Sequence, residues 1–286
     1  MPVALPLAWI TGAGGLIGSH LVKAASTCAP PWRVRGLTRA ELDLTDDAAV
    51  RRAFVQDAPE LIIHCAGLSK TVACEQNPGL AHRLNFEATA RLAELSVGIP
   101  FLFFSSDLVF DGRQGNYAES APINPLNLYA KTKAAAEQVV LRNLGHTVVR
   151  TSLNGGNSPT GDRGFNEEIR RAWAAGHSLK LFTDEFRCPL AAEVTARAVW
   201  ALLAADRPGL YHLAGNERLS RWQIGQLLAA RWPQLHPKLE PCSLRDYNGA
   251  PRSPDTSLCC AKIQKLLPFP LTGLGEWLAA HPREPF

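Results

Sequence analysis

The sequence lacks long apolar runs, blocks of like charge and any basic stretch at its start. No apolar run approaches the roughly 18 residues that a membrane-spanning helix needs, and the opening stretch MPVALPLAWITGAGG lacks the basic region of a signal peptide. No five like charges occur in a row, so neither nucleic acid nor a membrane surface is indicated as a partner. We therefore expect a soluble, cytoplasmic protein.

Cysteine and histidine spacings typical of metal sites are also missing. The seven cysteines contain no Cys-x-x-Cys pair, and the eight histidines contain no His-x-x-x-His pair. Seven is an odd number, and a disulfide framework is rare inside cells. We expect reduced thiols and no bound metal.

Size and composition are those of an ordinary globular protein. The 286 residues are 46% hydrophobic and 20% charged, enough for one large core with a smaller lobe attached. The formal net charge of +4 is small. A modest positive potential of this kind would suit an anionic small-molecule ligand.

Short apolar runs alternate with helical periodicity in the first half of the chain. This alternation predicts strands at 7–10, 33–37, 61–67, 101–106 and 146–150, and helices at 16–25, 43–56, 80–95 and 128–141. In the second of these helices, Thr45 is the expected N-cap. Apolar strands separated by helices indicate a parallel sheet covered on both faces, an α/β doubly wound fold.

The rhythm changes after Arg150. We predict helices at 165–175, 191–205 and 220–230 and strands at 179–182 and 209–213, with a proline-rich stretch at 233–254 that has little periodicity. We therefore divide the chain into a dinucleotide-binding domain at 1–152, and a second part at 153–286. That second part would combine the last elements of the sheet with a smaller substrate-binding lobe.

The stretch ITGAGGLIGSHLV, residues 10–22, lies where a first strand would meet a first helix. In a dinucleotide fold, Gly12 would allow the tight turn, Gly15 would let the backbone approach a pyrophosphate, and Gly18 would let helix and strand pack closely. The helix N-terminus would then offer unpaired N–H groups to the phosphates. This motif predicts a nucleotide-binding turn.

The glycine spacing, with HCAG at 64–67, FFSSDLVF at 103–110 and YAKTK at 129–133, resembles the extended short-chain dehydrogenase/reductase family. The resemblance implies a Rossmann fold with NAD(P) bound along the first strands. On this basis the expected cofactor-binding residues are Gly12, Gly15, Leu16, Ile17, Gly18, Thr38, Arg39, Asp43, Leu44, Cys65, Ala66, Gly67, Tyr129 and Lys133.

Tyr129 and Lys133 are four residues apart and would share one face of a helix. An ammonium near a phenol favours the phenolate, so we expect Lys133 to lower the Tyr129 pKa. Tyr129 would donate a proton to a carbonyl oxygen as hydride reaches the carbon, and the Ser106 hydroxyl would donate a hydrogen bond. The resemblance implies that Lys133 also holds the nicotinamide ribose. We expect Ser106, Tyr129 and Lys133 to be catalytic.

The region around these residues is similar to the dTDP-4-dehydrorhamnose reductases, as are RTSLNGG at 150–156, DEFRCPL at 184–190, GLYHLAG at 209–215 and the segment at 251–268. The chain departs from that family at Leu108, where a tyrosine is usual, and at Leu153, where a tryptophan is usual. Asp107 is followed by Leu108 and not by the glutamate of related dehydratases, which disfavours dehydration. The expected substrate-binding residues are Ser106, Asp107, Leu153, Arg187 and Arg252.

The end of the second predicted strand bears on the choice of cofactor. An acidic residue there would select NAD, whereas arginine accommodates the 2′-phosphate of NADP. The chain offers Thr38 and Arg39, with no acid before Glu41, so we expect NADPH, with NADH as the alternative. Asp43 resembles the aspartate that the family places near the adenine.

We therefore expect an NADPH-dependent reductase of a keto group, at C4 of a nucleotide-linked sugar, with a small-molecule substrate; the resemblance also allows a homodimer. Two other functions stay open. One is a sugar-nucleotide epimerase, in which hydride is removed and returned. The other is a non-catalytic NADP-binding regulatory subunit, because the sequence also resembles the beta subunit of methionine adenosyltransferase.

Overall fold

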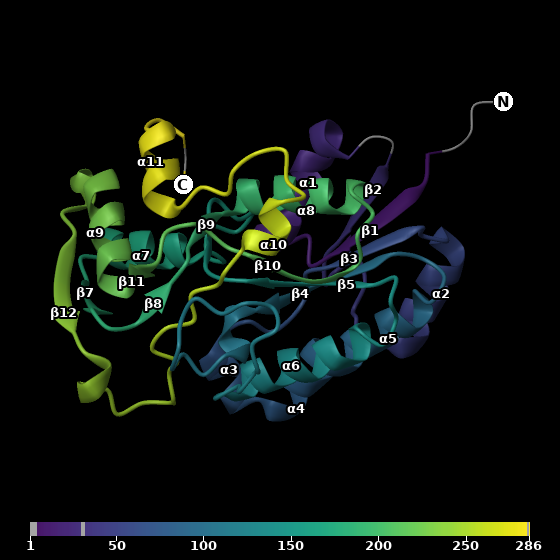
Figure 1. Cartoon of the computed structure of the whole chain (residues 1–286), viewed down its shortest axis with the longest axis horizontal. Helices are drawn as coiled ribbons and strands as arrows, with labels where there is room; N and C mark the ends of the chain where they lie inside the picture. Colours follow the sequence, from purple (N-terminus) through teal and green to yellow (C-terminus); the bar gives the residue numbers. More distant parts are fainter. Residues whose placement is uncertain (1–4, 30–31, 285) are drawn as a thin grey trace.

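A computed structural model describes residues 5–29, 32–284 and 286. In this part of the chain, six parallel strands form the central sheet in the order β10-β5-β4-β3-β1-β2 (Figure 1). They are β1 (Leu7–Thr11), β2 (Arg33–Leu37), β3 (Leu61–His64), β4 (Phe101–Ser106), β5 (Thr147–Thr151) and β10 (Gly209–Leu213). β2 and β3 lie on opposite sides of β1, so the strand order reverses there. This is the doubly wound α/β fold that the sequence predicts, and ligands of such sheets bind at the carboxyl ends of the strands beside the reversal.

Helices cover both faces of the sheet (Figure 1). One face carries α1 (Leu16–Cys28) and α8 (Ala192–Ala204), which pack against each other. The opposite face carries α2 (Asp47–Asp57), α5 (Ala88–Leu95) and α6 (Leu128–Val140). Because both faces are covered, the four inner strands β1, β3, β4 and β5 are buried along their whole length, whereas the edge strand β2 buries only Leu37.

The side chains of β1 alternate between two separate cores. Ala8 and Ile10 belong to the core under α1 and α8, whereas Leu7 and Trp9 belong to the core under α2, α5 and α6. All four side chains are at most 6% exposed. This alternation anchors the strand from both sides and holds the turn that follows it in place.

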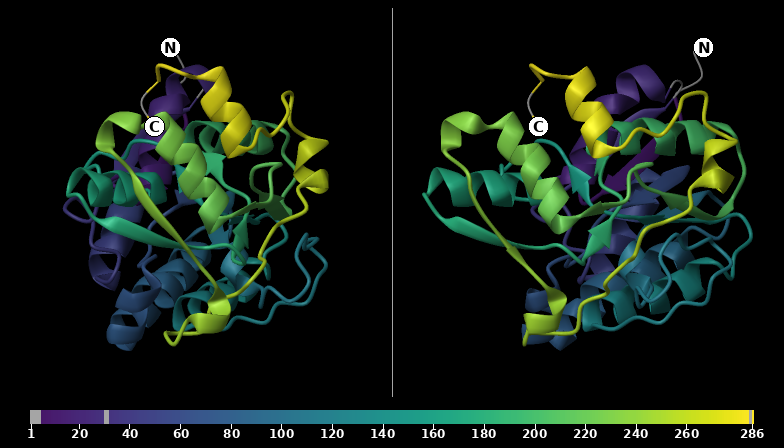
Figure 2. Two further views of the ribbon diagram at one scale, coloured as in Figure 1. Left: turned by 90° about the vertical axis from the view of Figure 1, so that its left-hand side faces the viewer. Right: turned by 60° about the vertical axis from the view of Figure 1, so that its left-hand side comes forward.

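A smaller lobe lies beside the sheet, on the left in Figure 1 and nearer the viewer in Figure 2. Its paired strands are β7 (Ser178–Phe182) with β12 (Lys238–Cys242), β8 (Phe186–Arg187) with β11 (Leu219–Ser220), and β6 (Asn154–Gly155) with β9 (Leu190–Ala191). The helices after β5, apart from α8, are α7 (Phe165–Ala174), α9 (Arg221–Arg231), α10 (Ala261–Gln264) and α11 (Leu274–Ala280). The C-terminal strand ends of the sheet therefore face a second set of elements.

Two local predictions were wrong. Thr45 does not cap α2; Asp46 does, because its carboxylate accepts from the Ala49 N–H, while the Thr45 hydroxyl donates to Asp43. The helix predicted at 80–95 is interrupted: α3 (Thr71–Gln76) and α4 (Pro78–His82) precede a π-helical turn at Arg83–Glu87, and α5 follows. A π turn inserts a residue that the 3.6-residue period cannot reveal.

The proline-rich stretch contains more structure than its periodicity suggests. β12 lies within it and pairs along its whole length with β7. In the described residues, every helix is too short or too polar to span a bilayer.

Candidate active site

The glycine-rich turn joins β1 to α1 as predicted. Gly12 has φ +73°, and a Cβ there would lie 2.6 Å from the Ala66 backbone N. A Cβ on Gly18 would lie 2.3 Å from the Gly12 carbonyl oxygen, so only glycine allows α1 to start this close to β1. Gly15 is the N-cap of α1. The turn thus presents backbone rather than side chains at the helix N-terminus.

α1 begins at Leu16, and its first-turn N–H groups have no partner within the helix. The first turn contains no acidic residue that would compete for these donors. The side chain of Leu16 is buried and that of Ile17 packs against the core, so these residues can offer a ligand their backbone N–H groups. Leu44 is buried in the other core.

At the end of β2, the acidic residue Glu41 contacts Thr38, which the sequence analysis did not predict. Glu41 Oε2 accepts hydrogen bonds from the backbone N and from Oγ1 of Thr38, both at 2.7 Å. The hydrogen bond from the Thr38 N–H lowers the Glu41 pKa the most, and the bond from the Thr38 hydroxyl lowers it further. Arg39 is exposed, and its Nε lies 3.8 Å from Asp43 Oδ2. Arg35, within β2, pairs with Asp57, so Arg39 is the cation that lies beside Glu41 and Asp43 with its side chain largely exposed.

The loop after β3 contains Cys65, Ala66 and Gly67 and is fixed by Asn85. The buried Asn85 amide lies in the π turn, accepts from Leu68 N at 2.7 Å and donates to Leu68 O at 3.1 Å. A Cβ on Gly67 would lie 2.9 Å from Asn85 Oδ1. Burial raises the pKa of Cys65, so its thiol stays protonated. The loop is consequently held beside Gly12, where the predicted cofactor would pass.

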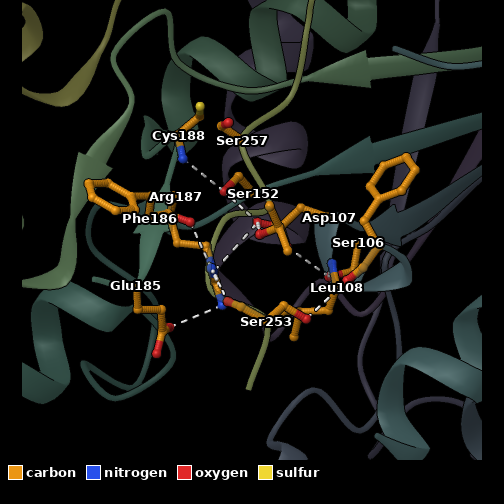
Figure 3. A network of polar contacts seen from close by, with 12 residues as sticks. Ser106, Asp107, Leu108, Ser152, Glu185, Phe186, Arg187, Cys188, Ser253 and Ser257 are labelled. Carbon is orange, nitrogen blue, oxygen red and sulfur yellow. Dashed lines mark hydrogen bonds and ion pairs between the residues drawn. The ribbon is translucent and has the colours of Figure 1, made fainter. Parts of the chain in front are cut away.

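Ser106 ends β4 and lies beside Asp107. Its Oγ donates to Asp107 Oδ1 at 3.2 Å and accepts from Leu108 N at 3.2 Å, which caps a short 3-10 turn. Asp107 is 4% exposed. Its Oδ2 accepts from Ser152 Oγ at 2.7 Å (Figure 3). The same oxygen accepts from Thr256 Oγ1 at 2.9 Å. The carboxylate is thus surrounded by donors.

Tyr129 and Lys133 lie on α6 close to the end of β4, and the Ser106 side chain interacts with Tyr129. The expected lowering of the Tyr129 pKa is wrong: burial raises it, and the negative charge of Asp107 adds to the rise, whereas Ser106 opposes it. Burial lowers the Lys133 pKa to about 8. The Lys133 ammonium lies 4.1 Å from the centroid of the Phe103 ring, a contact that favours the charged form and so opposes the effect of burial. The phenol therefore holds its proton at neutral pH.

Arg187 and Arg252 meet at Glu185 and not in open solvent. Arg187 is 5% exposed, and its guanidinium pairs with Glu185 at 3.0 Å and lies 3.8 Å from Asp107. Arg252 donates to both oxygens of Glu185, and Arg221 Nε lies 3.8 Å from Glu185 Oε1. One buried carboxylate therefore gathers three guanidinium groups next to the Ser106 end of the site.

The two positions that depart from the reductase pattern have different surroundings. Leu108 follows Asp107 in the 3-10 turn and is half-buried. Leu153 packs against the core under α1 and α8, and its carbonyl accepts from Leu190 N. Contact of Leu153 with a substrate stays a prediction.

Several residues of this site were not anticipated, among them Glu41, Asn85, Ser152, Glu185, Arg221 and Thr256. Ser152, Glu185 and Thr256 lie in segments that resemble the reductases, and that resemblance was the available signal for them. Their partners are distant in sequence, so only the folded chain brings them together. Among the residues placed by the structure, no three His, Cys, Asp or Glu side chains gather as a metal site would require.

Comparison with known proteins places this geometry in a family. The model described as RmlD substrate binding domain matches residues 8–280. The chain is 32% identical over 278 residues to methionine adenosyltransferase 2 subunit beta of Xenopus laevis, covering 91% of this chain and 82% of the relative. It is 30% identical over 290 residues to dTDP-4-dehydrorhamnose reductase of Streptomyces griseus, covering 98% and 89%.

Solved structures share the fold. The dTDP-4-dehydrorhamnose reductase of Bacillus anthracis str. Ames, in complex with NADP, superposes with a TM-score of 0.87 at 22% identity, covering 97% of this chain and 98% of that one. A hypothetical dTDP-4-dehydrorhamnose reductase of Sulfolobus tokodaii gives a TM-score of 0.83 at 26% identity, covering 93% and 97%.

Proposed function

The chain belongs to the RmlD substrate-binding-domain family of extended short-chain dehydrogenase/reductases, and we propose that it reduces a carbonyl group with NADPH, at C4 of a nucleotide-diphospho-sugar. The observation that carries the proposal is the position of Ser106, at the end of β4, next to the helix α6 that carries Tyr129 and Lys133. These three groups are the ones that a carbonyl reduction needs beside the hydride donor. The relatives named above are a dTDP-4-dehydrorhamnose reductase and a beta subunit of methionine adenosyltransferase 2.

The glycine turn fits a dinucleotide. Side chains at Gly12 and Gly18 would collide with backbone, and the N–H groups at the start of α1 are free for a pyrophosphate. Lys133 would hold the nicotinamide ribose, and Thr38 and Arg39 would meet the adenosine ribose with its 2′-phosphate. Bound NADPH would supply the hydride.

Tyr129 would deliver the proton. Because burial raises its pKa, the phenol stays protonated at neutral pH, which is the state needed to protonate an oxygen that gains negative charge. Ser106 would donate a hydrogen bond to the same oxygen. Lys133, whose pKa is about 8, would be mainly charged at neutral pH and would favour proton release from Tyr129.

The arginine cluster suits an anionic substrate. Glu185 and Asp107 carry two negative charges, and Arg187, Arg221 and Arg252 carry three positive charges. Arg221 and Arg252 keep 27% and 32% of their side chains exposed, whereas Arg187 does not reach solvent. Arg252 is thus the better of the two predicted arginines to meet a diphosphate, with Arg187 behind it.

The test is NADPH oxidation by the purified protein with a panel of nucleotide-activated 4-keto sugars, followed at the nicotinamide absorbance. We expect steady turnover with dTDP-4-keto-6-deoxyhexose. NADPH binding without turnover of any panel member would contradict the proposed reaction. Interconversion of sugar epimers without net NADPH consumption would favour the epimerase instead.

A non-catalytic regulatory role is the second candidate, because methionine adenosyltransferase 2 beta subunits share up to 32% identity with this chain. Such a protein would bind NADPH and a catalytic adenosyltransferase chain without oxidising the cofactor. Size-exclusion chromatography with a purified methionine adenosyltransferase would separate the two hypotheses. A stable complex, together with no turnover on the sugar panel, would decide for the regulatory subunit.

A further inference from the structure

Asp107 accepts the hydrogen bond that Ser106 would have to donate to the substrate in the proposed reaction. Ser106 Oγ donates to Asp107 Oδ1 at 3.2 Å. A hydroxyl group has a single proton, so Ser106 cannot donate to a substrate carbonyl while it donates to Asp107. The carboxylate and the substrate therefore compete for one donor.

The second oxygen of Asp107 is satisfied by groups other than Ser106 (Figure 3). Oδ2 accepts from Ser152 Oγ at 2.7 Å and from Thr256 Oγ1 at 2.9 Å, and Arg187 Nε lies 3.8 Å away. These contacts remain when Ser106 turns away. The buried Asp107 carboxylate then still has most of its hydrogen-bond and charge partners. Rotation of the Ser106 hydroxyl away from it therefore costs little free energy.

Arg187 is itself held in place by groups that do not touch Ser106. Its guanidinium donates to Phe186 O at 2.7 Å and to Ser253 O at 3.0 Å, and it pairs with Glu185 at 3.0 Å. These partners come from β8 and from the segment after β12. The positive charge beside Asp107 is therefore fixed by the lobe.

We propose that Arg187, Ser152 and Thr256 are positioning residues, which satisfy Asp107 in advance and thereby free the Ser106 hydroxyl to donate to the substrate carbonyl. The inference rests on the proposed reductase function. It makes Asp107 an acceptor that positions Ser106, not an acid or base of the reaction. If one of the other donors to Asp107 is removed, the hydrogen bond from Ser106 to Asp107 should become stronger. Ser106 should then be a poorer hydrogen-bond donor to the substrate carbonyl.

Thr256→Val tests this inference, because it keeps the shape of the side chain and removes one donor to Asp107. We expect kcat to fall by about tenfold, with the NADPH Kd unchanged. In a Ser106→Ala variant, the added Thr256→Val change should not lower kcat further, because residue 106 then has no hydroxyl that Asp107 could bind. Equal losses in both backgrounds would show a structural effect and overturn the inference.

The control is Thr195→Val on α8. Thr195 is fully buried, and its hydroxyl donates to Asn154 Oδ1 at 2.5 Å and not to Asp107. Its effect on kcat should be the same with and without Ser106→Ala. Arg187→Lys, which keeps the charge, should lose less activity than Arg187→Met, which removes the positive charge beside Asp107.

Unfolding by urea tests the competition without any substrate. If Asp107 retains Ser106 more strongly in Thr256→Val, then Ser106→Ala should lower the urea midpoint more in that background than in the natural protein. Additive midpoint shifts would overturn the inference whether or not the protein is a reductase. Non-additive midpoint shifts, together with no turnover on the sugar panel, would contradict the proposed function but not the competition for the Ser106 hydroxyl.

Discussion

Glu41 Oε2 accepts two hydrogen bonds from Thr38, one from the backbone N and one from Oγ1, each at 2.7 Å. These donors stand at the end of β2, where the ribose 2′ position of a dinucleotide is recognised. The Thr38 N–H lowers the Glu41 pKa, so the side chain is an anion at neutral pH. A 2′-phosphate at Thr38 would compete with this carboxylate for the same donors.

Glu41→Gln should therefore strengthen NADPH binding. We expect the NADPH Kd to fall by up to about tenfold, because a like charge is removed from the phosphate position. The NADH Kd should change less. Fluorescence titration with both cofactors measures the difference. If NADH binding weakens and NADPH binding stays the same, Glu41 instead accepts the ribose hydroxyls of NADH.

Arg39→Ala should have the opposite selectivity. The Arg39 side chain is 77% exposed and lies 3.8 Å from Asp43, so it can turn toward a phosphate without leaving a buried partner. We expect NADPH affinity to drop several-fold more than NADH affinity. The comparison is best made at low ionic strength, where surface charges are least screened. Equal losses for the two cofactors would show that Arg39 does not recognise the 2′-phosphate.

Tyr129→Phe should remove turnover and spare the fold. Loss of the proton donor is expected to lower kcat by about 10²- to 10⁴-fold, with the NADPH Kd nearly unchanged. Stopped-flow measurement of NADPH oxidation gives the rate, and circular dichroism checks the fold. A variant with full activity would refute the role of Tyr129. Tyr211→Phe is the matched control, because Tyr211 is buried and its hydroxyl donates to Arg207 O, away from the proposed catalytic group.

Gly18→Ala should damage both packing and cofactor binding. The added methyl group would lie 2.3 Å from the Gly12 carbonyl oxygen, which forces α1 away from the turn. We expect a loss of about 1–3 kcal/mol in the free energy of unfolding, and weaker NADPH binding. Gly98→Ala is the control, because no atom lies within 4 Å of the Cβ it would add. Equal behaviour of the two variants would argue against a close approach of α1.

His64 should make the protein less stable in acid. Burial, followed by the charge of Lys133, lowers the His64 pKa from 6.5 to about 3. Its ring nitrogens contact the Thr11 and Thr89 hydroxyls at 2.6 and 3.0 Å, an arrangement that suits a neutral imidazole.

Between pH 6.5 and about pH 3 the unfolded chain binds a proton that folded His64 does not, so stability falls as the pH falls through this window. His64→Gln should reduce this slope, whereas His177→Gln, at an exposed site, should not. Urea midpoints from pH 7 to pH 4 provide the measurement. An unchanged slope in His64→Gln would contradict a neutral buried His64.

Local periodicity was sufficient for the sheet. The predicted strands at 33–37, 101–106 and 209–213 match β2, β4 and β10 residue for residue. The apolar run of β4 has few alternatives in a covered parallel sheet. By contrast, β12 contains Pro241 and mostly exposed side chains, so its pairing with β7 could not be predicted from its own residues.

By itself, the sequence determined the glycine turn, the doubly wound parallel sheet and the position of Tyr129 and Lys133 on one helix. Those features depend on spacing within one turn or helix, or on the alternation of apolar strands with helices. The tertiary structure alone decided the Tyr129 pKa and the joining of Asp107 to Arg187. Burial and charge pairing depend on segments as far apart as β4, β8 and the chain around Thr256, and no local pattern encodes the distance between them.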